Sequence, residues 1–282
     1  MLKPRTAAIP DELWEAAWQR LPFLAGMPAE DVTALRAMTE AFLARKVFSG
    51  AHGYEPDDLA RLTIAIQACL PVLKLGLQAY DGWRGIIVYP GEFVIPRQVM
   101  DEDGVQHDYE EDALGEAWEG GPVVLSWFDD PADYDGAHVV IHEFAHKLDQ
   151  LSGEADGLPP LHAGMSQEDW LRDFDAAYAD FCQRVDTEAE TLIDPYAAEH
   201  PAEFFAVCSE VFFTSAQDLT ADYPDVYRHL CDFYRQEPGK WRRVTSMQQN
   251  LWRPPEAAPK LKVPAPHKAQ RSRYSSTLRR PS

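Results

Sequence analysis

Cysteine is scarce in this sequence: there are four in 282 residues, and no two of them form a CxxC pair. The arrangement argues against a disulfide framework, and a chain of this length is able to bury a sizeable core without one. Three of the four fall in apolar helical patterns, so we predict buried free thiols and a reducing, cytoplasmic location. The cysteines are Cys69, Cys182, Cys208 and Cys231.

Long apolar runs are absent as well. The longest, around residues 70–77, is interrupted by Pro71 and Lys74 and is too short to span a bilayer. The N-terminal segment has early basic residues but no apolar stretch after them, so no signal peptide is expected. We therefore predict a cytoplasmic protein that does not bind membranes.

Basic residues are few and unevenly placed. The chain has 26 Lys and Arg against 46 Asp and Glu, a net charge of −20, which argues against direct nucleic-acid binding. Eight of the basic residues lie between Arg253 and Ser282, together with six prolines and no hydrophobic period. This composition predicts a disordered tail over residues 254–282. A solubilising tail is the simpler interpretation, and docking on the acidic body or on an anionic partner is the alternative.

The hydrophobic periodicity predicts helices first, strands in the middle and helices after. The predicted helices cover residues 11–21, 29–46, 56–75, 135–151, 166–187, 200–215 and 219–236, and the predicted strands cover 85–94 and 121–130. The acidic segment 101–112 is expected to be a loop or a hairpin tip. The order indicates the α+β class, mainly helical with a small mixed β-sheet. We predict one domain over residues 1–253, with a helical part at about 10–80 and a catalytic part at about 81–240.

The segment HEFAHKLD, residues 142–149, contains two histidines four residues apart. On a helix, with about 100° per residue, His142 and His146 lie on one face about 40° apart. Apolar side chains fall on the opposite side: Val140, Ile141, Phe144, Leu148 and Leu151. Imidazoles at i and i+4 reach a single metal ion, and Glu143 beside them has the position of a general base, so the pattern indicates a zinc enzyme. The alternative is a pair of histidines on a solvated helix face.

A catalytic zinc ion needs three protein ligands and one open position. The continuation HExxHxxGxxH is absent, since residue 149 is Asp and residue 152 is Ser. His162 lies in a Pro/Gly-rich loop without a helical anchor. Asp149, one turn below His146, is better placed to accept a hydrogen bond from a ligand than to bind the metal.

The better candidate lies in DPYAAEHPAEFFAVCSEVFF, residues 194–213. Pro201 predicts the first helical position, which places Glu203 in the first turn. Glu203 and Glu210 share one face of an otherwise apolar helix, and buried carboxylates are costly unless they are paired or bound to a metal. This helix is therefore expected to face a cation, and a salt bridge to an arginine is the alternative.

These two motifs resemble the Mlc titration factor A family of zinc metallopeptidases. The strand GPVVLSW and the run VYRHLCDFYRQEPGKW are similar to that family too, and the likeness covers roughly residues 10–240. The resemblance implies a zincin-like peptidase with one zinc ion per chain. It also implies a catalytic core similar to that of anthrax lethal factor, in which a tyrosine stands seven residues before the third-ligand glutamate, as Tyr196 stands before Glu203 here.

The resemblance also assigns roles to single residues. The implied zinc ligands are His142, His146 and Glu203. Glu143 is implied as the general base that activates water, and Tyr196 as the group that stabilises the transition state. Glu210 and Asp149 are expected behind the ligands, where a carboxylate orients a histidine. Lys147 departs from the uncharged residue that many zinc peptidases have there, although it points off the ligand face.

We therefore predict a zinc-dependent, aminopeptidase-like metallopeptidase that hydrolyses peptides. The strand 122–127 is expected to be the edge that pairs with an extended substrate, with Trp127 either lining the pocket or buried in the core. The resemblance implies an alternative: a non-catalytic or additional role in binding an Mlc-like transcriptional repressor of the glucose phosphotransferase system. The presence of Glu143 and Tyr196 favours the enzyme, since a purely structural zinc site needs neither.

Overall fold

The structure is a computed structural model of the chain, and it describes residues 8–91, 93–100, 106–128 and 138–241. All of these residues belong to one compact unit, residues 1–243. The tail predicted for residues 254–282, and with it the boundary at residue 253, lies outside the described residues.

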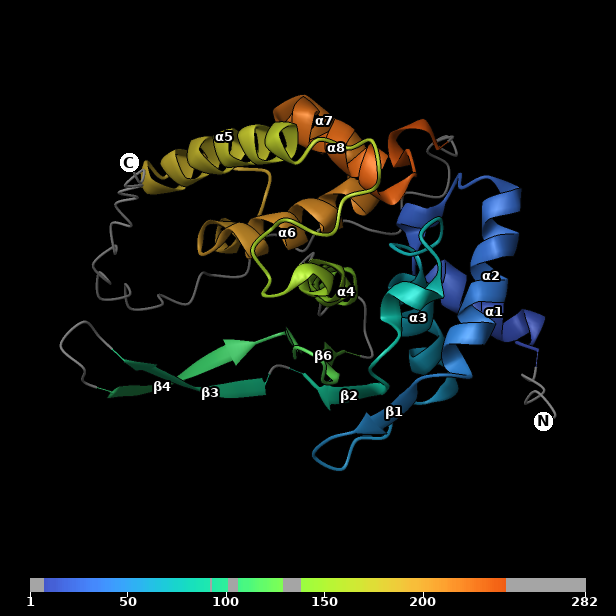
Figure 1. Cartoon of the computed structure of the whole chain (residues 1–282). Helices are drawn as coiled ribbons and strands as arrows, with labels where there is room; N and C mark the ends of the chain where they lie inside the picture. The colour runs from blue at the N-terminus through green and yellow to red at the C-terminus, as the bar shows by residue number, and fades with distance from the viewer. Residues whose placement is uncertain (1–7, 92, 101–105, 129–137, 242–282) are drawn as a thin grey trace, which may run out of the picture. The chain divides into compact units, whose positions relative to one another are not determined.

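Three helices open the described chain and pack against one another (Figure 1). They are α1 (Asp11–Gln19), α2 (Ala29–Leu43) and α3 (Asp58–Cys69). The side chain of Asp57 caps α3 by accepting a hydrogen bond from the amide of Ala60, and most of this helix is buried. The helix ends before the predicted residue 75, because Pro71 has no amide proton and cannot continue the hydrogen-bond ladder.

Four strands form a mixed sheet in the order β1-β2-β6-β5. They are β1 (Val47–Gly50), β2 (Gly85–Pro90), β5 (Gly115–Ala117) and β6 (Val123–Trp127). The first three in this order are parallel, whereas β5 runs antiparallel to β6. Together with the helices, this small mixed sheet confirms the predicted α+β class, although β1 and β5 themselves were not predicted.

The strand β6 lies inside the sheet and not at its edge. It pairs with β2 on one side and with β5 on the other, and all five of its residues are buried. The prediction that residues 122–127 pair with an extended substrate is therefore wrong, because neighbouring strands already occupy both sides. Trp127 is 4% exposed and belongs to the core, the second of the two positions expected for it.

A separate hairpin follows β2 in the sequence. Its strands are β3 (Phe93–Met100) and β4 (Gln106–Ala113), which pair antiparallel along their whole length. The acidic segment expected to be a loop or a hairpin tip is thus a strand from residue 106 onward. The strand predicted over 85–94 is divided between β2 and the start of β3.

The helix α4 (Val139–Asp149) lies between the sheet and α6 (Pro201–Thr214), in contact with β5 and β6 on one side and with α6 on the other (Figure 1). Beyond α6 are α5 (Gln167–Asp186), α7 (Ala216–Asp222) and α8 (Pro224–Tyr234). The single helix expected over residues 219–236 is two helices, because Pro224 begins α8 and cannot continue α7. The two helices that carry the sequence motifs are therefore neighbours in the interior.

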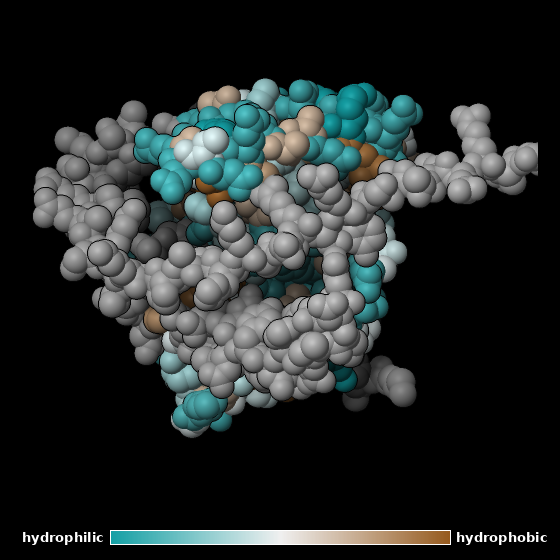
Figure 2. Space-filling view, turned by 90° about the vertical axis from the view of Figure 1, so that its left-hand side faces the viewer, coloured by the Kyte–Doolittle hydropathy of each residue, from teal (hydrophilic) through white to brown (hydrophobic). Residues whose placement is uncertain are grey.

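Part of the surface of the described chain is strongly hydrophilic. Figure 2 shows mainly hydrophilic side chains over the upper part of one face, where α5 lies in Figure 1. Within the described ranges, no helix is both long enough and apolar enough to cross a membrane. The four cysteines are free thiols, as predicted: Cys69 and Cys208 are buried, and Cys182 and Cys231 are half-buried.

Candidate metal centre

The helix α4 is buried on every side. All residues from Val139 to Asp149 are less than a tenth exposed, including His142 at 9%, Glu143 at 4% and His146 at 8%. The alternative of two histidines on a solvated face is therefore wrong, and the polar side chains face α6 and β5 instead of water. Leu151, expected on the apolar face of this helix, lies in the following turn η4 (Gln150–Ser152) and is 49% exposed.

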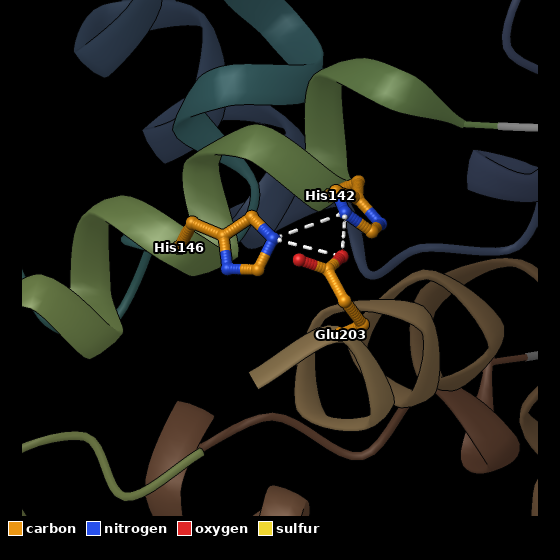
Figure 3. Close-up of side chains that lie close together, drawn as sticks. All are labelled: His142, His146 and Glu203. Atoms are coloured by element: carbon orange, nitrogen blue, oxygen red, sulfur yellow. Dashed lines mark hydrogen bonds and ion pairs between the residues drawn. The ribbon is translucent and has the colours of Figure 1, made fainter. Parts of the chain in front are cut away.

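Two histidines of α4 and one glutamate of α6 converge on a single point, as Figure 3 shows. The Oε2 atom of Glu203 lies 3.0 Å from Nε2 of His142 and 3.2 Å from Nε2 of His146, and the two nitrogens are 3.1 Å apart. Pro201 occupies the first turn of α6, and the ring of His200 accepts a hydrogen bond from the amide of Ala202, so the start of the helix is fixed. Glu203 therefore projects from a defined first turn towards α4.

The geometry and the donor set of these three groups fit a zinc ion. Ligand atoms around a tetrahedral zinc with bonds of about 2.0–2.1 Å are about 3.3 Å apart, close to the separations found here. Two imidazole nitrogens and one carboxylate oxygen are a donor set of catalytic zinc sites, which keep a fourth position open. Among the described residues this is the one cluster of three or more His, Cys, Asp or Glu side chains that converges in this way.

Glu210 lies behind His142. Its Oε1 atom is 2.8 Å from Nδ1 of His142, and its Oε2 atom accepts a hydrogen bond of 2.8 Å from the backbone amide of His138, the N-cap residue of α4. Burial opposes a charge on the His142 ring, but the hydrogen bonds to Glu203 and Glu210 raise its pKa well above the ordinary value. In the described part of the chain no arginine pairs with either glutamate, so the arginine alternative is wrong for these residues.

Asp149 is also buried, but the structure does not join it to His146 by a hydrogen bond. Its Oδ2 atom accepts a hydrogen bond of 2.8 Å from the amide of Gly157, and within the described chain neither Oδ1 of Asp149 nor Nδ1 of His146 has a partner. Burial raises the pKa of Asp149 to about 6. Asp149 thus fixes the loop after α4, and its bond to His146 stays a prediction.

Glu143 lies against the edge strand. A Cβ atom at Gly115 in β5 would collide with the Glu143 carboxylate, so the backbone of β5 approaches this side chain as closely as a glycine allows. The Oε2 atom of Glu143 is buried without a hydrogen-bond partner in the described chain. Burial, reinforced by the neighbouring carboxylates and partly offset by His142, raises the pKa of Glu143 to about 8.

Tyr196 is near the convergent side chains but outside their hydrogen-bonded group. It belongs to the turn η5 (Pro195–Ala198), where the side chain of Asp194 accepts a hydrogen bond from its amide. Its side chain is 42% exposed, and its ring centre lies 6.2 Å from that of His142. His162, the other histidine weighed as a ligand, is instead bonded through Nε2 to the carbonyl of Phe233.

Gly115 and the burial of Lys147 were not identified from the sequence. Gly115 carried a usable signal, because an isolated glycine in a strand often marks a close approach of another group. Lys147 does point away from the ligands, as expected, but it is 3% exposed and bonded to backbone carbonyls, which nothing in its sequence position indicates.

Comparison with known proteins identifies the family of this chain. The family model described as glucose-regulated metallo-peptidase M90 matches residues 3–235. Mlc titration factor A of Cronobacter sakazakii is 38% identical over 237 residues, which are 83% of this chain and 89% of that protein. The proteins of that name from Salmonella gallinarum and Salmonella typhimurium are each 36% identical over 237 residues, which are 81% of this chain and 88% of theirs. The chain therefore belongs to the glucose-regulated metallo-peptidase M90 family.

Proposed function

We propose that the protein is a zincin-like, zinc-dependent peptidase with one zinc ion per chain, held by His142, His146 and Glu203. The observation that carries the proposal is the approach of the three ligand atoms to within 3.0–3.2 Å of one another in the interior. When bound, zinc supplies Lewis-acid chemistry, since it acidifies water and polarises a carbonyl group. Glu210 would hold the His142 ring so that Nε2, and not Nδ1, faces the metal.

Glu143 is proposed as the general base. Its Oε2 atom, which has no hydrogen-bond partner in the described chain, is able to accept a proton from water and to pass it to a leaving amine. The lack of a side chain at residue 115 leaves room for the carboxylate at this place. The base would therefore be held by the edge strand as well as by its own helix.

Tyr196 and β5 are proposed to contact the substrate. The exposed phenol, seven residues before Glu203, is in reach of a developing oxyanion near His142. Within the described residues β5 pairs on one side alone, with β6, so its other side is open to an extended peptide. The substrate edge is therefore assigned to residues 115–117 in place of 122–127.

Zinc content and peptide hydrolysis test the proposal. Wild type is expected to bind about one zinc ion and to cleave peptides, whereas Glu143→Gln is expected to retain zinc and to lose about 10²–10⁴-fold in kcat. Glu168→Gln, an exposed acid of α5, is the control and should match wild type. Wild type without zinc, or Glu143→Gln with full activity, would refute the peptidase. Faster cleavage of a free than of an N-acetylated peptide would support aminopeptidase-like action.

A second candidate function rests on the name of the relatives. Proteins called Mlc titration factor A are 36–38% identical to this chain. Binding of an Mlc-like repressor is therefore proposed as an additional role that does not require catalysis. A purified Mlc-type repressor should be bound equally by wild type and by Glu143→Gln, and no binding by either would eliminate this candidate.

A further inference from the structure

The most unusual charged group outside the metal centre is the ammonium of Lys147. Lys147 directly follows His146 in α4 and is 3% exposed. In the described chain no carboxylate lies within ion-pair distance of its ammonium group. Its hydrogen bonds go instead to the carbonyl oxygens of Trp118 and Gly121, with a longer contact of 3.4 Å to Oε1 of Gln150. A buried charge persists only where its hydrogen bonds are satisfied, so these contacts are specific.

Both carbonyls belong to the turn that joins β5 to β6. Trp118 directly follows β5, its amide bonds to the carbonyl of Pro122, and the amide of Gly121 bonds to the carbonyl of Trp118. Gln150 adds a third contact, because its Nε2 atom donates a hydrogen bond of 2.7 Å to the carbonyl of Ala117, the last residue of β5. Side chains from the end of α4 therefore hold the end of the edge strand.

The other end of β5 is set by the general base. Gly115 leaves no room for a Cβ atom beside the Glu143 carboxylate. The strand has three residues, so its two ends lie close together. The contacts of α4 with the turn and with Gly115 therefore bear on where the open edge of the strand lies relative to the metal centre.

We infer that Lys147 is a positioning residue of the peptidase: its ammonium clamps the β5–β6 turn onto α4 and keeps the substrate edge in register with the metal centre. The inference rests on the proposed function and deepens it, because it concerns how the same site aligns a peptide. Lys147 itself touches no ligand and no reacting atom. Its effect acts through the carbonyls of Trp118 and Gly121.

The chain offers a matched control in Lys46. This lysine is 8% exposed and donates hydrogen bonds to the carbonyls of Tyr80 and Trp83, at 2.6 and 2.7 Å. Both ammonium groups lie over the same indole ring, Lys46 at 3.3 Å and Lys147 at 5.2 Å from the centre of Trp83. Neither hydrogen bond of Lys46 involves the β5–β6 turn. Lys46→Met therefore removes a buried lysine that is bonded to carbonyls but leaves the contacts of the edge strand intact.

The test compares full-length Lys147→Met, Lys46→Met and wild type, each loaded with zinc. Steady-state kinetics are measured on a peptide of about eight residues and normalised to bound zinc. Hydrogen exchange is measured for the amides of residues 114–121. We expect KM to rise about tenfold for Lys147→Met with a smaller change in kcat, because uniform binding along the strand is weakened. We expect exchange over residues 114–121 to be at least tenfold faster, with neither change for Lys46→Met.

Two outcomes overturn the clamp. If Lys147→Met exchanges and binds peptide like Lys46→Met, the lysine only stabilises the fold. If exchange accelerates equally in both variants, the effect comes from a general loss of stability. Should wild type cleave no peptide, the proposed function has failed, and the exchange comparison alone still decides whether Lys147 holds β5.

Discussion

Two clusters of histidine and carboxylate side chains lie between pairs of helices, and they differ in how their charges are compensated. Between α4 and α6, two histidines meet Glu203 and Glu210, and no arginine pairs with either carboxylate in the described chain. Between α5 and α8, His229 lies 2.8 Å from Asp173, which also pairs with Arg172 and Arg228. The first cluster lacks a cation that the second already contains.

The difference separates a site from a structural contact. Near α4, buried atoms of His146, Glu143 and Asp149 have no hydrogen-bond partner among the described residues, and three ligand atoms point inward at one another. At Asp173 two guanidinium groups and an imidazole surround one carboxylate, so nothing further is required for neutrality. A buried histidine beside an acid is therefore not, by itself, evidence for metal binding. Evidence for metal binding is the convergence of several ligand atoms whose negative charge no neighbouring cation compensates.

The largest expected effect comes from the carboxylate at the point of convergence. Glu203→Gln removes an anionic ligand while keeping its shape, so zinc binding is expected to fall by more than the 10–100-fold that loss of an outer partner causes. Zinc retained after dialysis measures this effect. Asp173→Asn is the comparison and should retain zinc like wild type. Equal zinc loss in both variants would remove the distinction between the two clusters.

A smaller loss of zinc affinity is expected from a substitution of Glu210, which contacts the ligand His142 but does not itself bind the metal. Glu210→Gln still occupies the space beside His142 but no longer offers two anionic oxygens to Nδ1 and to the amide of His138. Zinc affinity is expected to fall about 10–100-fold, with kcat per bound zinc changed less. Competition with a chelator of known affinity gives the value. An unchanged affinity would show that the helix alone orients His142.

At the second cluster we expect a change in stability and none in activity. Asp173→Asn leaves the guanidinium groups and the imidazole without their shared acceptor, at a cost of about 1–2 kcal/mol in the free energy of unfolding. Urea titration at pH 7 measures the loss. Peptide cleavage per bound zinc should equal that of wild type, and a fall in kcat would mean that α5 and α8 act on the site.

The smallest effect is a dependence on pH. Hydrogen bonding to Arg172, opposed by burial and aided by His229, lowers the pKa of Asp173 from 3.8 to about 2. A carboxylate with a depressed pKa stabilises the folded state above its ordinary pKa, and this contribution is lost as the pH falls towards 2. The stability difference between wild type and Asp173→Asn should therefore be constant from pH 7 to about 5 and shrink below pH 4. A difference independent of pH down to 3 would contradict this assignment.

Much of the site could be predicted from the sequence because each of its motifs lies within a single helix. The four-residue spacing of His142 and His146 and the proline that starts α6 have direct structural meaning, and the structure brings the predicted groups together. The contact between the two helices joins residues 57–61 positions apart. Two acids on one face of an apolar helix indicated that this helix faces a cation, and the resemblance implied the complete set of three ligands.

The errors arise where one pattern has two meanings. The run VVLSW was assigned to an edge, yet a continuous apolar strand without polar alternation is typical of a strand covered on both faces. β5, with three residues, is too short for any periodicity to show. Lys147 was expected only to point off the ligand face, and its burial could not be predicted because it depends on carbonyls supplied by a turn about 26–29 residues earlier.

The hydrogen bond from the amide of His138 to Glu210 has a consequence for how the chain folds. α4 has no side-chain cap of its own, so the acceptor at its first turn comes from α6, 72 residues later. An isolated helix of eleven residues is marginal in water, and one without a cap is weaker still. The start of the ligand-bearing helix therefore gains its acceptor only when α6 docks, and a nascent chain that ends before residue 210 lacks the carboxylate that holds this end of the helix.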